Sequence, residues 1–301
     1  MTALRNVTVR DGATRRGPRG GARRLALLLV GSLVAGAGLV PVAAPRPLGA
    51  QVSVDELEVH MQLAPDRAPI TRVIPVRNEE DVAQQVRISL GDWTRDSLGY
   101  NLFTEPGSQP SSCGDRVQVF PQTFQVAAGA TEMVRVAYTP TPADSGCWSI
   151  VFIETVKPPP AQPDAQGSFL TIEIRTGVKL YVHRPGEIAL GAVQDAWMDE
   201  VWRRVNSASG VPDSVRVREA TVLFANTGTA HLRVRSTMEI RSLDNRVLHT
   251  IDGGEAPMTP GSTRQIRIPL PALAAGDYVA IVLLDYGGDE VTAAQLDIRI
   301  P

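Results

Sequence analysis

Runs of alternating apolar and polar residues, separated by Pro, Gly and Ser, recur along most of the chain. The longest covers residues 168–185, where the even-numbered positions from 170 to 182 are apolar apart from one threonine and lie on one face of a single strand. The apolar row consists of Leu170, Ile172, Ile174, Val178, Leu180 and Val182. An ordinary strand has about 5 or 6 residues. This one is therefore long enough to pack a core with one end and to present an apolar row with the other.

The first half of the chain contains about seven such segments, which is the number required by an immunoglobulin-like sandwich. Near Leu57 the alternation slips, which indicates a bulge or a strand that changes partner sheets. Pro75 cannot donate to a ladder, so we expect it at an edge or a bulge. The strands predicted before residue 168 cover residues 52–63, 70–78, 82–93, 98–103, 117–126, 131–138 and 146–156.

The pattern starts again at Gly186 and predicts a second sandwich of about 115 residues. In residues 186–205, Trp197, Val201 and Val205 also recur at helical spacing, so a short helix remains an alternative to a strand there. The other strands are predicted at residues 214–225, 231–242, 246–251, 263–268, 276–286 and 290–300. The predicted fold is all-β, with two immunoglobulin-like β-sandwich domains in tandem, residues 51–185 and 186–301.

Residues 1–50 have the layout of a secretory signal peptide. Five arginines between positions 15 and 24 precede an apolar run at residues 25–40, and Leu48-Gly49-Ala50 forms a small-residue site for cleavage after Ala50. We expect an exported, periplasmic protein. An uncleaved form anchored in the membrane or at the surface is the alternative.

The composition agrees with a globular, exported, two-domain protein of 301 residues, 43% hydrophobic and 21% charged. The leader holds 8 of the 30 Lys and Arg and 1 of the 32 Asp and Glu, so the remainder has a net charge near −9. A nucleic-acid-binding protein needs a basic face to replace phosphate counterions. Nucleic acid is therefore not an expected partner.

Both cysteines, Cys113 and Cys147, lie in the exported part, and a single structural disulfide is the simplest interpretation. Each precedes or begins a strand at the same end of the predicted sandwich. Two thiols alone do not make a metal site. The four histidines are scattered along the sequence, and we interpret each as a strand or surface residue: His60, His183, His231 and His249.

The chain after the leader contains no nucleophile motif, metal-ligand spacing or dinucleotide fingerprint. We therefore expect a protein that is not an enzyme, that uses no cofactor and that has no small-molecule substrate.

The segment VKLYVHRP at residues 178–185 resembles the last strand of the first domain in PapD-like periplasmic chaperones of the chaperone–usher pilus pathway. Further similarities are VSVD at residues 52–55, the spacing of Pro121, Phe124, Val126 and Gly129, and an aromatic strand that ends in Glu154. The resemblance covers residues 52–186.

This resemblance implies that Leu170, Ile172 and Ile174 are donated to an incomplete immunoglobulin-like pilus or envelope subunit, and that Lys179 anchors the subunit's terminal carboxylate. It also implies an outer-membrane usher as a possible partner. Where the family has an arginine on the first strand, this chain has Glu58, whose charge would repel a carboxylate.

The alternation by itself leaves a second interpretation open, because half-buried strands alternate in any sandwich. The three donor residues could face their own core and Lys179 could be a solvated strand lysine. The protein would then be a structural or adhesive envelope protein of two sandwiches with no chaperone cycle.

Overall fold

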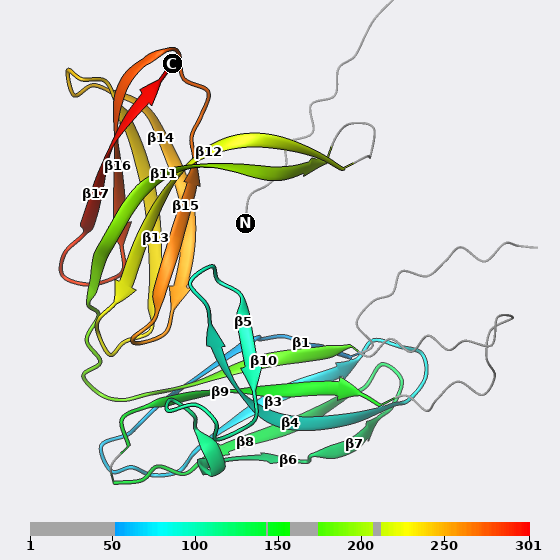
Figure 1. Cartoon of the computed structure of the whole chain (residues 1–301). Helices are drawn as coiled ribbons and strands as arrows, with labels where there is room; N and C mark the ends of the chain where they lie inside the picture. Colours follow the sequence, from blue (N-terminus) through cyan, green and yellow to red (C-terminus); the bar gives the residue numbers. More distant parts are fainter. Residues whose placement is uncertain (1–51, 143, 157–173, 207–211) are drawn as a thin grey trace, which may run out of the picture. The chain divides into compact units, whose positions relative to one another are not determined.

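The computed structural model describes residues 52–142, 144–156, 174–206 and 212–301 (Figure 1). In these ranges the chain is built from β-strands, with one short 3-10 helix, η1 (Gly114–Arg116). Strands β1–β10 pair among themselves, and so do strands β11–β17. The chain therefore forms two β-sandwiches in tandem, and the predicted all-β fold class is confirmed. The predicted signal peptide lies outside the described residues. No helix in the described ranges is long and apolar enough to cross a membrane.

The first sandwich packs one four-stranded sheet against a second, larger sheet. The first sheet has the order β1 (Val52–Val54), β3 (Ile70–Asn78), β8 (Thr131–Tyr138), β6 (Val117–Phe120). The second has the order β2 (Glu58–Gln62), β10 (Arg175–His183), β9 (Cys147–Thr155), β4 (Gln84–Arg95), β5 (Asn101–Thr104), and β7 (Thr123–Val126) pairs with β4. Side chains from both sheets fill the core between them, including Val59, Met61, Val134, Val136, Val151 and Ile153.

Two segments of the first sandwich cross from one sheet to the other. At residues 55–57 the chain leaves β1, which pairs with β3, and enters β2, which pairs with β10. This confirms the sheet change predicted from the slip near Leu57. The predicted single strand at residues 117–126 is instead two strands, because the ladder is interrupted at Pro121, which follows a cis peptide bond and cannot donate to it. Of these two strands, β6 pairs with β8 and β7 pairs with β4.

Pro75 lies in β3 at the point where the neighbouring strand ends. The last residue of β1 pairs with Val76, so no described strand continues the ladder on that side of Pro75. The proline is therefore placed where its missing N–H breaks no pairing, as its chemistry requires.

The second sandwich packs a three-stranded sheet against a four-stranded sheet. The first consists of β11 (Gly191–Asn206), β12 (Pro212–Asn226) and β15 (Thr263–Pro269). The second has the order β14 (Val247–Met258), β13 (Leu232–Arg241), β16 (Gly276–Asp285), β17 (Thr292–Ile300). The core contains Val222, Phe224, Met238, Ile240, Ile268 and Leu284.

The helix considered for residues 197–205 is wrong, because these residues belong to the continuous strand β11. It pairs with β12 over its whole length, with one irregularity between Val193 and Asp195. Residues 212–218 of β12 pair with β11 alone, so the far ends of both strands extend beyond β15 as a two-stranded ribbon (Figure 1). Pairing with β12 supplies the backbone hydrogen bonds that a helix would have made internally.

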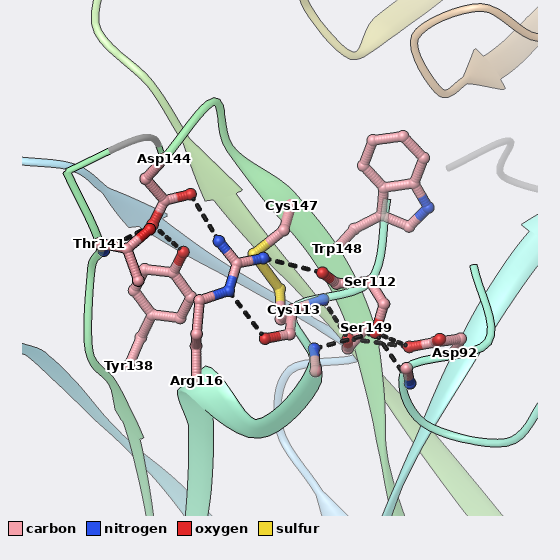
Figure 2. The surroundings of a disulfide bond; sticks show 12 residues. Asp92, Ser112, Cys113, Arg116, Tyr138, Thr141, Asp144, Cys147, Trp148 and Ser149 are labelled. Atoms are coloured by element: carbon pink, nitrogen blue, oxygen red, sulfur yellow. Dashed lines mark hydrogen bonds and ion pairs between the residues drawn. A yellow bond between two sulfur atoms is a disulfide. The ribbon is translucent and has the colours of Figure 1, made fainter. Parts of the chain in front are cut away.

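The predicted disulfide between Cys113 and Cys147 is present (Figure 2). It joins the residue before η1 to the first residue of β9, where β9 pairs with the end of β10 through Cys147 and Val182. The Cys113 N–H donates to the Ser149 hydroxyl at 3.1 Å. The disulfide therefore holds together the end of the sheet at which β10 ends in His183.

Beside the disulfide lies an ion pair with a fully buried carboxylate (Figure 2). Arg116 donates to Asp144 at 2.8 Å, and the Tyr138 hydroxyl donates to the other carboxylate oxygen. Burial and the bond to Asp144 raise the pKa of Tyr138 above the usual range. This network ties the segment between β8 and β9 to η1.

Candidate functional site

The last strand of the first sandwich, β10, runs from Arg175 to His183 and is shorter than the predicted strand. Of the predicted donor residues, Leu170 and Ile172 lie outside the described residues. Ile174 is described: it precedes β10, is half-buried and is not part of a strand. Ile174 lies outside the strand because the ladder with β9 ends at the pair Arg175 and Glu154, one residue before β9 itself ends.

The inner face of β10 carries the three residues of the predicted apolar row that follow the proposed donor residues. Val178, Leu180 and Val182 are all buried among the side chains of the first sandwich. The alternation therefore correctly identified which residues of this strand face the core.

The first half of β10 has one open edge. Strand β9 pairs with residues 175–182, but β2 reaches only residues 179–183. The Lys179 N–H donates to the Leu57 carbonyl on the β2 side at 2.8 Å. Backbone groups two residues apart point the same way along a strand, so those of Gly177 face the same side, where no described strand pairs with them. We call residues 175–178 of β10 the open edge.

Lys179 lies at the end of the open edge and pairs in register with Glu58. The Glu58 carboxylate forms an ion pair with Arg233 of the second sandwich. The Lys179 ammonium instead lies 4.4 Å from the centroid of the Trp93 ring. Burial, and then the positive charge of Arg95, lower the pKa of Lys179. Glu58 thus lies beside the lysine, and its carboxylate pairs with Arg233.

A cleft of about 550 Å³ adjoins this group and is lined by residues of both sandwiches. Its charged lining residues are Glu58, Arg95, Arg233, Arg235, Glu255 and Asp285. Trp93 and Tyr181 form one aromatic side of the cleft, with their rings edge to face at 5.8 Å. Burial raises the pKa of Tyr181 above the usual range. The cleft is therefore suited to a charged or amphipathic ligand.

Three of the four histidines, which are far apart in the sequence, meet at the edge of this cleft. His60 and His183 are strand residues, as predicted, but their meeting with His231 was not predicted. His60 Nδ1 lies 2.8 Å from His183 Nε2, and His183 Nδ1 lies 3.0 Å from Glu187 Oε2. The His231 ring packs edge-on against Tyr181 and Trp148, with centroid distances of 4.8 and 5.0 Å. In this group His60 comes from β2 and His183 from β10. Glu187 lies in the segment between the sandwiches, and His231 precedes β13.

Burial lowers the pKa of His231 to about 3, with a further contribution from the charges of His183 and His60. Burial is also the largest cause of the lowered pKa of His60. The His231 imidazole is therefore neutral across the physiological range. The sequence offered no signal for this group, because its members are separated by long stretches of chain and no spacing motif joins them.

No protein-family model matches the sequence. No curated protein matches it. Among solved structures, the class 5 fimbriae chaperone CfaA is similar at 12% identity and a TM-score of 0.45, covering 83% of this chain and 99% of that one. The E. coli chaperone DraB has 16% identity and a TM-score of 0.38, covering 83% of this chain and 98% of that one.

A third similar structure is the CsuC–CsuE chaperone–tip adhesion subunit pre-assembly complex from the archaic chaperone-usher Csu pili of Acinetobacter baumannii. It has 12% identity and a TM-score of 0.41, and covers 82% of this chain and 98% of that one. Identities this low assign no role to a side chain of the present protein.

Proposed function

We propose that this protein is an exported, periplasmic chaperone-like protein that binds incomplete immunoglobulin-like subunits of a pilus or of the cell envelope by lending them a strand. The observation that carries this proposal is the open edge of β10, which has a partner on one side only among the described strands. An outer-membrane usher is a possible further partner. No catalytic chemistry is involved.

The open edge supports the proposal because an unpaired strand edge is a template for another chain. A subunit that lacks one strand would pair its backbone with residues 175–178, and the preceding apolar residues would fill its unfinished core. In such β-augmentation the main-chain hydrogen bonds supply affinity, and alternate side chains supply specificity. Leu170, Ile172 and Ile174 continue the alternation of the buried residues of β10 toward its free end.

Lys179 is the proposed contact for the subunit's terminal carboxylate. Its ammonium group has no carboxylate within ion-pair distance among the described side chains, and Glu58 is engaged by Arg233. Arg95 adds positive charge to the same side of the strand. This arrangement favours a carboxylate over a cation as the bound group.

A co-purification experiment tests strand donation. The tagged protein is expressed with its signal segment, recovered from the periplasm, and compared with the double variant Ile172→Asp, Ile174→Asp. We expect the parent to retain one or more subunits that the variant loses, because a charged residue cannot enter an apolar groove without a large desolvation cost.

The matched control is Leu243→Asp, which changes an exposed leucine of the second sandwich in the same way. The control should retain the same partners as the parent. Recovery of every partner by the double variant would rule out donation and favour the structural or adhesive alternative.

Lys179→Ala tests the anchor separately. It should weaken binding of a subunit peptide with a free C-terminal carboxylate and leave binding of the amidated peptide unchanged, since only the charged end contacts the lysine. Equal affinity of parent and variant for the free-acid peptide would remove Lys179 from the site.

A further inference from the structure

The histidine group beside the cleft carries an inference that does not depend on strand donation. His183 is the last residue of β10, Glu187 lies in the segment between the sandwiches, and His231 precedes β13. One ligand atom from each lies within 4.8 Å of the other two. We propose that these three residues bind one divalent transition-metal ion, with Zn²⁺ as the representative ion.

The spacing suits a zinc ion. Zinc bonds to imidazole nitrogen at about 2.0–2.1 Å and to carboxylate oxygen at about 2.0–2.2 Å, which sets neighbouring ligand atoms of a tetrahedron about 3.3 Å apart. His183 Nδ1 and Glu187 Oε2 are already 3.0 Å apart. The His231 ligand atom lies within 4.8 Å of the other two, so a shift of at most about 1.5 Å gives the tetrahedral spacing. The fourth position remains open to water or to a group from a partner.

The chemistry of His231 supports this role. Both of its ring nitrogens are buried, and neither has a hydrogen-bond partner. A buried polar atom without a partner is costly, and a metal ion would satisfy one of these nitrogens. The ring is also held in place, because Tyr181 and Trp148 both pack against it. A neutral imidazole with a free lone pair is the form that binds a metal ion.

The other two ligands are oriented by neighbours in the way that metal ligands usually are. If His183 binds the ion through Nδ1, its Nε2–H is free to donate to His60 Nδ1 at 2.8 Å. The second carboxylate oxygen of Glu187 accepts the Arg184 N–H at 3.0 Å, which leaves Oε2 directed at His183. His60 is thus a positioning residue for His183.

The group borders two clefts. His183 and His231 line the cleft of about 550 Å³, and Glu187 and His231 line a neighbouring cleft of about 460 Å³. His183 belongs to the first sandwich, Glu187 to the segment after it and His231 to the second sandwich. A bound ion would therefore cross-link the two sandwiches and hold the end of β10 beside the second domain.

Isothermal titration of Zn²⁺ into the metal-free protein, prepared without a histidine tag, tests this site. We expect one saturable site per chain. His183→Ala, Glu187→Gln and His231→Ala should each weaken binding by more than about tenfold. Zn²⁺ should also raise the thermal unfolding midpoint of the parent by more than it raises the midpoints of these variants.

His249→Ala is the matched control, because it removes the one exposed histidine of β14, outside the group. It should bind Zn²⁺ like the parent. Glu187→Gln retains the size and the hydrogen-bonding oxygen of the side chain, so it separates loss of a ligand from loss of the fold. Co²⁺ in place of zinc should give the visible absorption of a tetrahedral site in the parent and in His249→Ala, and not in the three ligand variants. The absence of a saturable site would overturn the proposal. So would an affinity for Zn²⁺ in the three ligand variants equal to that of the parent.

Discussion

Replacing Asp144 with asparagine should strongly destabilise the first sandwich. The Asp144 side chain is 0% exposed, and it accepts hydrogen bonds from Arg116 and from the buried Tyr138 hydroxyl. Asparagine retains the size but removes the charge that compensates the guanidinium, and its amide nitrogen cannot accept a bond. The local arrangement is visible in Figure 2.

The magnitude follows from the burial of the two partners. Breaking a buried ion pair by removing one member costs about 3–5 kcal/mol. Arg116 is 25% exposed and also donates to the carbonyls of Cys113 and Ser112 at 3.1 and 2.8 Å. Part of its charge therefore remains solvated, and we expect a loss near the lower limit, about 3 kcal/mol. Tyr138→Phe removes a single hydrogen bond and should cost about 1 kcal/mol.

Urea unfolding of the disulfide-bonded protein measures these losses, and hydrogen exchange of β8 and β9 assigns them to the first sandwich. The control is Asp277→Asn, which breaks an ion pair with Arg299 of the same 2.8 Å length on the surface. That substitution should cause no measurable change, because exposed pairs contribute little. Equal losses of stability from the two aspartate substitutions would refute the argument that the Asp144 network is stabilising because it is buried.

Three further outcomes are expected. Replacing both Cys113 and Cys147 with alanine should lower the free energy of unfolding by about 3 to 4 kcal/mol, the loop-closure term for their separation of 34 residues, as a shift in the urea midpoint. Phe224→Ala, at a fully buried core position, should destabilise the second sandwich by about 3–5 kcal/mol and leave hydrogen exchange in the first sandwich unchanged. Tyr138 and Tyr181 have raised pKa values, so ultraviolet titration of the folded protein should show neither ionising near pH 10. The unfolded state then loses these protons first, so their stabilising contribution should be complete below about pH 10 and decline above it; ionisation of either residue near pH 10 in the folded protein would contradict the assignment.

Much of the fold follows from local patterns. The bounds of β3 and β8 agree with the alternation, because a strand that is buried on one face must alternate wherever it packs. The core residues Val178, Leu180 and Val182 are readable in the same way. The disulfide is also predictable, because an exported chain with two cysteines has one possible pairing.

Local patterns failed where the choice of partner decides the structure. Helical spacing in residues 197–205 was overruled by pairing with β12, and the run at residues 117–126 was divided between two sheets. Neither outcome is encoded in the run itself, since both depend on the strand that lies alongside it.

The sequence by itself determined the all-β class, the two sandwiches and the apolar face of β10, because these depend on alternation within single segments. Only the tertiary structure decided which strand edges have partners and which distant side chains meet. The open edge exists because β2 begins opposite Lys179 and so leaves the preceding residues of β10 without a partner on that side. The group of His60, His183 and His231 exists because two paired strands and a residue of the second sandwich converge there. Such convergence depends on packing between segments and leaves no mark in the spacing of residues along the chain.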